Sequence, residues 1–232
     1  ASIRYEKMPL CGGAIIDKRH ILTAAHCFRM KNIASPANLY VVVGNLHVSE
    51  ETVLKKVQQL FIHEDYSPYF YHNDIAVLRI AGTFENWTDE IQPINLTETS
   101  ITSGICTVSG WGNNLYLEKS GTQWLYSMEV PIVDWTFCNE QFTKSGIPLE
   151  DKVICAGAIE KDSCQRDSGG PLVCSDTLSG IVSYGVHCDR ENYPGIYTEV
   201  AKYINWIEQQ KQSPDPKIDE TYPLIIIVTV LL

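Results

Sequence analysis

The sequence predicts an all-β protein, built as a sandwich or a barrel, with a helix near its C-terminal end. Short β-branched, apolar runs recur along the chain between Gly, Pro, Asn and Asp residues, which is typical of such folds. These runs are residues 39–44, 74–80, 104–112, 171–174, 179–185 and 195–200. The chain has 232 residues and is 44% hydrophobic, which is enough apolar material for a large core. Barrel proteins of this size often form a single unit.

The remaining elements follow from local patterns. Residues 1–16, ASIRYEKMPLCGGAII, already have the character of a strand. Asp134 is a suitable N-cap for a short helix over WTFCNEQF. Val200, Tyr203, Ile204 and Ile207 recur at i, i+3, i+4 and i+7 and predict a second helix. After Gln212 a polar, Pro-rich segment predicts a linker.

Charge and cysteine content restrict the class of protein. The net charge is −10 and the pI is near 5.0, so we expect no nucleic acid or anionic membrane as a general partner. The eight cysteines include no CxxC pair, which argues against a zinc ribbon. Buried thiols in a cytosolic protein and disulfides in a secreted protein are the two alternatives. Two glycosylation sequons, at Asn86 and Asn95, favour the secreted setting.

Three short motifs contain the chemistry. Ser168 lies in DSCQRDSGGP, between an acid and two glycines. A serine hydroxyl becomes a nucleophile only when a base removes its proton, and a third group must orient that base. His26, in LTAAHC, is the candidate base. Asp74, in HNDIAVL, enters a buried strand and needs a partner such as an imidazole N–H.

These motifs, in the order His, Asp, Ser, resemble those of the trypsin-like (chymotrypsin-fold) serine proteases. The resemblance covers roughly residues 1–210 and includes CGGAII, VSGWG, ICAG and YPGIYTEV. It implies two six-stranded antiparallel β-barrels, with the active site between them and a C-terminal helix. We therefore expect a protease domain over residues 1–212, followed by a linker and apolar tail over residues 213–232.

The resemblance also implies the role of each site residue. His26 is the general base, Asp74 orients it, and Ser168 is the nucleophile that forms an acyl-enzyme. The backbone N–H groups of Arg166 and Ser168 form the oxyanion hole. Substrate-binding positions are Asp162, Ser163, Gln165, Ser183, Tyr184, Gly185 and Gly195. Asp162, at the base of the specificity pocket, implies an endopeptidase that cleaves after Arg or Lys.

The family pattern implies further features of the chain. The cysteines pair as Cys11–Cys27, Cys106–Cys174, Cys138–Cys155 and Cys164–Cys188. Members are made as zymogens, and an activating protease frees an N-terminus that pairs with Asp167. That segment and a signal peptide are not in the sequence, so we expect the natural chain to start earlier. Protein or peptide substrates, serpins and Kunitz-type inhibitors are the expected partners. We expect no cofactor and no calcium, because Asn45 stands where the first acidic calcium ligand would be.

Two features depart from the family pattern. Arg166 stands where glycine is usual, and its Cβ adds strain if the position needs φ > 0. Arginine keeps the N–H donor, so we expect a slow, selective protease, with a non-catalytic binding homologue as the alternative. The tail after Ser213 resembles a GPI-anchor signal, with a truncated membrane segment or an unstructured end as alternatives. We therefore expect a secreted, extracellular protein and leave an anchored cell-surface form open.

Overall fold

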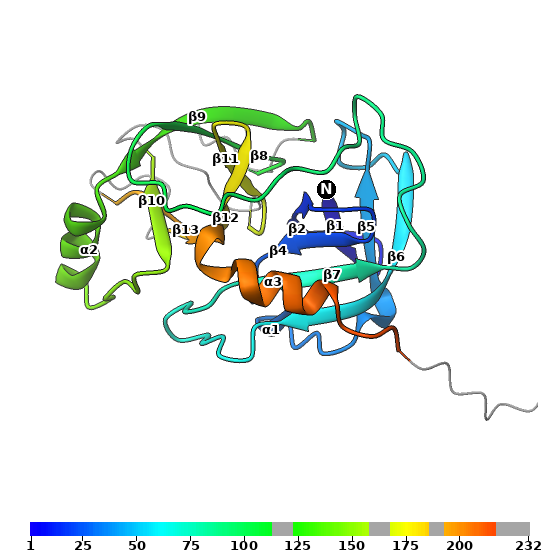
Figure 1. Ribbon diagram of the computed structural model, residues 1–232, viewed down its shortest axis with the longest axis horizontal. Helices are drawn as coiled ribbons and strands as arrows, with labels where there is room; N and C mark the ends of the chain where they lie inside the picture. Colours follow the sequence, from blue (N-terminus) through cyan, green and yellow to red (C-terminus); the bar gives the residue numbers. More distant parts are fainter. Residues whose placement is uncertain (113–122, 158–167, 186–192, 217–232) are drawn as a thin grey trace, which may run out of the picture.

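Two antiparallel β-barrels lie side by side, and the C-terminal helix packs along the first of them (Figure 1). The structure is a computed structural model that describes residues 1–112, 123–157, 168–185 and 193–216. The first barrel consists of β1 (Ser2–Tyr5), β2 (Met8–Gly12), β3 (Ala14–Ile15), β4 (His20–Thr23), β5 (Leu39–Val43), β6 (Val53–Ile62) and β7 (Ala76–Ile80). The second consists of β8 (Ile105–Gly110), β9 (Tyr126–Val133), β10 (Val153–Ala156), β11 (Pro171–Cys174), β12 (Thr177–Tyr184) and β13 (Gly195–Glu199).

Gly13 divides one long strand of the first barrel into two. The strand order is β2-β1-β5-β6-β7-β4-β3, so β2 and β3 lie at opposite edges of the sheet although they are consecutive in the chain. The chain through Gly13 therefore joins the two edges and nearly closes the barrel. A Cβ on Gly13 would lie 2.7 Å from Cγ2 of the buried Ile21. This barrel thus has six strand positions, with one of them interrupted.

The second barrel is closed, with the order β10-β13-β12-β11-β8-β9. Its core is formed by inward-facing side chains of all six strands, and Tyr197 is fully buried there. Two disulfides brace it. Cys106–Cys174 joins β8 to β11, and Cys138–Cys155 joins β10 to the neighbouring helix. The predicted two-barrel fold is confirmed.

Both predicted helices are present. The helices are α1 (His26–Arg29), α2 (Trp135–Lys144) and α3 (Ile204–Lys211), with 3₁₀ turns η1 (Pro36–Asn38) and η2 (Val200–Tyr203). The side chain of Asp134 caps α2 by accepting the N–H of Phe137 at 3.0 Å. Val200, Tyr203 and Ile207 are buried in the core of the first barrel. Among the residues that the structure describes, no helix is long and apolar enough to cross a membrane.

The first residues form a hairpin and not a single strand. The chain turns at Glu6 and Lys7, whose φ angles of 49° and 70° match a two-residue hairpin turn. From β1 the side chain of Arg4, only 4% exposed, reaches the loop between β5 and β6. It donates to the carbonyls of Val48 and Glu50 at 2.6 and 2.9 Å, and to the Glu51 carboxylate at 2.8 Å. The loop between β5 and β6 is thus held by a buried arginine.

A second buried arginine fastens the end of α3 to the first barrel. Arg79, at 2% exposure in β7, donates to the carbonyls of Gln210 and Lys211, both at 3.0 Å. Its Nε donates to Nε2 of His20 at 3.0 Å. The last carbonyls of a helix have no partner within the helix, so the guanidinium satisfies groups that would otherwise be unpaired.

We predict that Arg79→Met loosens this attachment. The change leaves His20 Nε2 and two carbonyls without their donor, and should lower the free energy of unfolding by ~2–4 kcal/mol in urea titrations. Arg19→Met is the matched control, because Arg19 and Arg79 both contact Asp215 but the Arg19 side chain is 33% exposed. Solvent screens such a pair, so the control should have nearly the wild-type midpoint. Equal midpoints for both variants would contradict the buried-anchor interpretation.

Candidate active site

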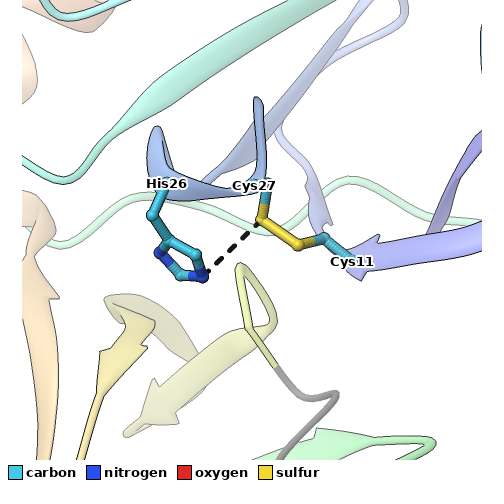
Figure 2. A group of neighbouring side chains, drawn as sticks. All are labelled: Cys11, His26 and Cys27. Carbon is cyan, nitrogen blue, oxygen red and sulfur yellow. Dashed lines mark hydrogen bonds between the residues drawn. A yellow bond between two sulfur atoms is a disulfide. The ribbon is translucent and has the colours of Figure 1, made fainter. Parts of the chain in front are cut away.

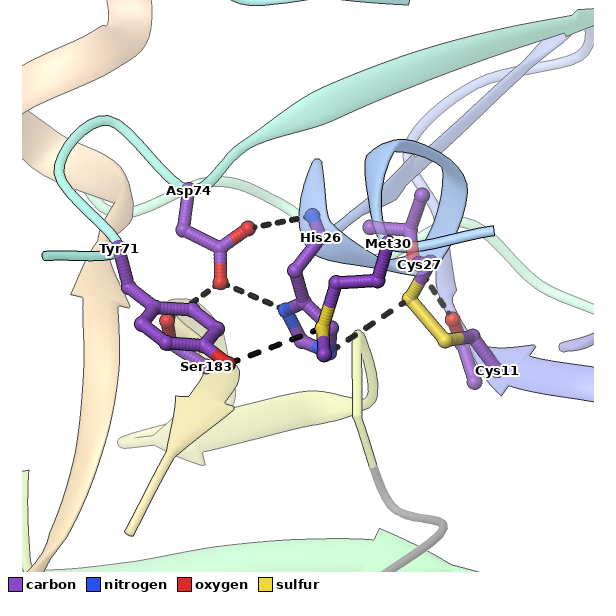
Figure 3. Close-up of a disulfide and its surroundings, with 9 residues drawn as sticks. Cys11, His26, Cys27, Met30, Tyr71, Asp74 and Ser183 are labelled. Carbon is purple, nitrogen blue, oxygen red and sulfur yellow. Dashed lines mark hydrogen bonds and ion pairs between the residues drawn. A yellow bond between two sulfur atoms is a disulfide. The ribbon is translucent and has the colours of Figure 1, made fainter. Parts of the chain in front are cut away.

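The carboxylate of Asp74 lies immediately before β7 and is completely buried. Its Oδ1 accepts the backbone N–H of His26 at 2.8 Å, and its Oδ2 lies 2.7 Å from Nδ1 of His26. The Ser183 hydroxyl also donates to Oδ2 (Figure 3). An ionised buried carboxylate needs such donors. With Nδ1–H donated to Asp74, the imidazole keeps its free electron pair on Nε2.

Asn73 fixes the backbone that presents Asp74. It adopts φ of 52°, a region that asparagine tolerates better than most residues. Its N–H donates to Glu150 at 2.9 Å, and its side-chain Nδ2 donates to the carbonyl of Asp65 at 3.0 Å. Its Oδ1 accepts from Lys152 and from the Tyr203 hydroxyl. The loop before β7 is thus tied to the chain before β10 and to the C-terminal turn η2.

His26 is the first residue of α1, and a disulfide braces it from the neighbouring position (Figure 2). Cys27 is bonded to Cys11 at the end of β2, which is the pair that the family resemblance implies. Nε2 of His26 lies 4.0 Å from Sγ of Cys27. Cys11, His26 and Cys27 cluster closely enough to suggest metal ligands. The two sulfurs are bonded to each other, so they offer no thiolates and the cluster is a covalent brace.

Ser168 is held against the first barrel through its main chain. Its carbonyl accepts the N–H of Gly12 at 2.9 Å. Gly169 donates to the carbonyl of Val182 at 2.8 Å, and Val182 donates to Gly170 at 2.9 Å. In Figures 2 and 3 the loop that follows the grey trace rises toward the His26 ring. Gly12 follows Cys11, whose disulfide partner is Cys27, the neighbour of His26, so the Ser168 main chain is bonded to the strand that the disulfide joins to α1.

Gly169 occupies a position where no other residue fits. Its φ is 77°. A Cβ there would overlap the Thr23 hydroxyl and lie 2.8 Å from the carbonyl oxygen of Gly12. Thr23 itself donates to that carbonyl at 2.8 Å. The glycine after Ser168 therefore allows the loop to touch the first barrel.

The remaining predicted site residues fall into two groups. Tyr184 ends β12 with Gly185 after it, and Gly195 begins β13 and is buried. Ser183, expected on the substrate side, directs its buried hydroxyl at Asp74. The others lie outside the described residues: Asp162, Ser163, Cys164, Gln165, Arg166, Asp167 and Cys188. Most of the apolar tail, residues 217–232, lies outside as well.

Sequence reasoning missed an aromatic pair beside His26. The ring of Tyr71 meets the His26 ring edge-on, with 5.8 Å between the two ring centroids. The centroids of the Tyr71 and Tyr184 rings lie 4.9 Å apart. Burial, followed by the Asp74 carboxylate, raises the pKa of Tyr71. Burial raises the pKa of Tyr184 as well, with Glu150 and Asp74 adding to the effect. Both hydroxyls therefore stay protonated. The aromatic loop over residues 69–72, YFYH, was the available signal.

Comparisons with known proteins agree on one family. The family model described as Trypsin matches residues 1–207. Trypsin II-P29 of Gallus gallus is 36% identical, over 86% of this chain and 78% of the relative. Transmembrane protease serine 11B of Homo sapiens is also 36% identical, but the aligned region is about half (51%) of its length and 89% of this chain. The solved structure of mouse neuropsin, described as a serine protease, has a TM-score of 0.80 at 28% identity, covering 90% of this chain and 92% of that one.

We predict that Gly169→Ala disturbs the Ser168 loop more than backbone strain alone explains. The overlap with Thr23 adds an overpacking cost of ~1–3 kcal/mol, while the positive φ costs ~1–2 kcal/mol for any Cβ. Gly82→Ala separates the two effects, because Gly82 has φ of 72° but no atom within 4 Å of the added carbon. Chemical denaturation should show a clearly larger loss for Gly169→Ala. Equal losses would mean that the loop is not pinned to the first barrel.

Proposed function

This chain belongs to the trypsin family of serine proteases, and from that premise we propose that it is an extracellular endopeptidase that cleaves after Arg or Lys. The observation that supports catalysis best is the fully buried Asp74 carboxylate, which accepts two hydrogen bonds from His26. A surface or purely structural histidine does not need this arrangement. A general base does, because its tautomer and ring orientation must be fixed before substrate arrives.

The proposed reaction uses Ser168 as nucleophile. Nε2 of His26 removes the hydroxyl proton while Oγ attacks the carbonyl carbon of the scissile bond. The tetrahedral intermediate collapses when the protonated His26 gives that proton to the leaving amine, which leaves an acyl-enzyme on Ser168. Water, activated by the same nitrogen, then releases the acid product. Asp74 stabilises the imidazolium in both steps and does not itself become protonated.

Substrate selection is proposed to depend on Asp162 and on the edge of β12. A carboxylate at the base of a narrow pocket favours the long cationic side chains of Arg and Lys. Gly185 and Gly195 would form walls that leave the pocket open. Ser183, Tyr184 and Gly185 would pair with the substrate backbone, as an exposed strand edge can. The N–H groups of Arg166 and Ser168 would bind the oxyanion.

An extracellular setting is consistent with the covalent structure. All six cysteines in the described part of the chain are disulfide-bonded, as expected in an oxidising compartment. Asn86 and Asn95 both have exposed side chains, so glycans could be attached without unfolding the chain. The protease domain is proposed to span residues 1–212, which α3, ending at Lys211, supports. Synthesis as a zymogen, with Asp167 paired after activation, is part of the same proposal.

Labelling by a fluorophosphonate tests the nucleophile. We predict that the activated full-length protein is labelled at Ser168 and that Ser168→Ala abolishes labelling. Asp74→Asn should keep the fold but slow labelling and peptide hydrolysis by roughly 10⁴-fold, because His26 then adopts the wrong tautomer. A folded, activated protein that resists labelling while binding peptides would favour the non-catalytic homologue.

Paired substrates test the specificity pocket. We predict that amides of Arg and Lys are hydrolysed far faster than those of Phe or Leu, and that Asp162→Ser removes this preference. The change should raise KM for Arg amides while labelling of Ser168 by a small fluorophosphonate persists. Equal wild-type rates on Arg and Phe amides would refute the assignment of Asp162.

A further inference from the structure

A methionine near His26 accepts a hydrogen bond from a tyrosine whose ring contacts the histidine. Met30 follows α1, and its side chain is 63% exposed. Its Sδ accepts a hydrogen bond from the Tyr71 hydroxyl at 3.7 Å, and Figure 3 shows the side chain reaching from α1 across the His26 ring toward Tyr71. The pair therefore bridges α1 and the loop before β7 at the open edge of the site.

Tyr71 is well held for this contact. Its ring touches both His26 and Tyr184, and its raised pKa keeps the hydroxyl protonated as a donor. His26 is only 7% exposed although its Nε2 must meet substrate in the proposed reaction. The Met30–Tyr71 bridge lies on the Tyr71 side of this ring, where a change in its position would alter the space beside His26.

We propose that Met30 is an oxidative modification site that controls access to His26, an inference that rests on the proposed protease function. A peroxide transfers one oxygen atom to Sδ: two electrons pass from the sulfur to the O–O bond, a sulfoxide forms, and water leaves from hydrogen peroxide. Within the protein only Sδ is oxidised, the two peroxide oxygens take up its two electrons, and Tyr71 keeps its proton. The reaction needs an exposed thioether, which Met30 presents.

Oxidation should tighten the bridge and not open it. A thioether sulfur is a weak acceptor, whereas sulfoxidation makes the side chain polar. A sulfoxide oxygen directly between Sδ and the Tyr71 oxygen would lie too close to the hydroxyl, but one set to the side of that line would accept an O–H···O bond of about 2.7–2.8 Å. The modified side chain is then held more firmly beside His26. Substrates with a bulky residue before the cleaved arginine need the most room beside His26, so they should be affected most.

Met8 provides a matched control within the same chain. It is 70% exposed in β2, so peroxide should reach it as readily as Met30. The activated full-length wild type, Met8→Leu, Met30→Leu and Tyr71→Phe are treated with hydrogen peroxide, and sulfoxides are located by peptide mass mapping. Kinetics then use amides with Gly-Arg and Phe-Arg before the cleaved bond.

We expect kcat/KM on the Phe-Arg amide to fall roughly fivefold in the wild type and in Met8→Leu, the factor that one neutral hydrogen bond is worth. The Gly-Arg amide should be less affected, and methionine sulfoxide reductases should restore the rate. Met30→Leu and Tyr71→Phe should show little response to peroxide. An equal loss in Met30→Leu, or an unchanged rate in wild type with Met30 converted to sulfoxide, would overturn the inference.

Failure of the proposed function would be visible separately. In that case the untreated protein neither labels with a fluorophosphonate nor cleaves either amide. The bridge is then tested by the ¹³C-methyl signals of the methionines, because Tyr71→Phe must shift the Met30 signal and leave that of Met8 in place. An unmoved Met30 signal would overturn the inference whatever the activity.

Discussion

The rest of the site depends on the burial of the Asp74 carboxylate. A charge with no solvent contact is stable only when the protein supplies its hydrogen-bond donors. His26 supplies two of them from the first barrel, and Ser183 supplies a third from β12 of the second. Thr198, on β13, binds the main-chain carbonyl of the same residue at 2.8 Å. The acid therefore has its full set of partners only when the two barrels are docked, so the fold and the site form together.

The loops around this carboxylate are held in conformations that free chains avoid. Tyr71 and Asn73 both have positive φ, and Gly169 turns with φ of 77°. Such residues persist only where the surroundings over-determine them. Asn73 uses its N–H and both of its side-chain polar atoms, and Gly169 is bound on one side to Val182 and packed on the other against Thr23. The strain at Tyr71 and Asn73 therefore lies in the loop that presents Asp74, whereas glycine adopts the positive φ after Ser168 without strain.

Local patterns predicted the strands and helices, and the family resemblance supplied long-range pairs such as Cys11–Cys27. Strand runs, the Asp134 cap and the period of α3 are set by neighbouring residues, and the structure contains them. Gly13 lies against Ile21, and Arg79 binds the carbonyl of Gln210, which is more than a hundred residues away in the sequence. Local sequence patterns do not reveal either contact. Ser183 was predicted as a substrate-binding residue, and the structure directs its buried hydroxyl at Asp74, a contact that no neighbouring residue in the sequence reveals. Tyr71 was missed because an aromatic loop predicts no particular partner.

Covalent and ionic braces hold opposite sides of the first barrel. The Cys11–Cys27 disulfide lies next to His26, whereas Arg79 binds the end of α3 and Arg4 binds the loop between β5 and β6. A buried guanidinium that donates to main-chain carbonyls fixes both position and direction, because its donors form a rigid planar fork. The chain has a net charge of −10. These two arginines place positive charge beside main-chain carbonyls, which are hydrogen-bond acceptors. These arginines thus fix the first barrel at the end of α3 and at the loop between β5 and β6, whereas the exposed Met30 is tied to its surroundings through the Tyr71 hydroxyl.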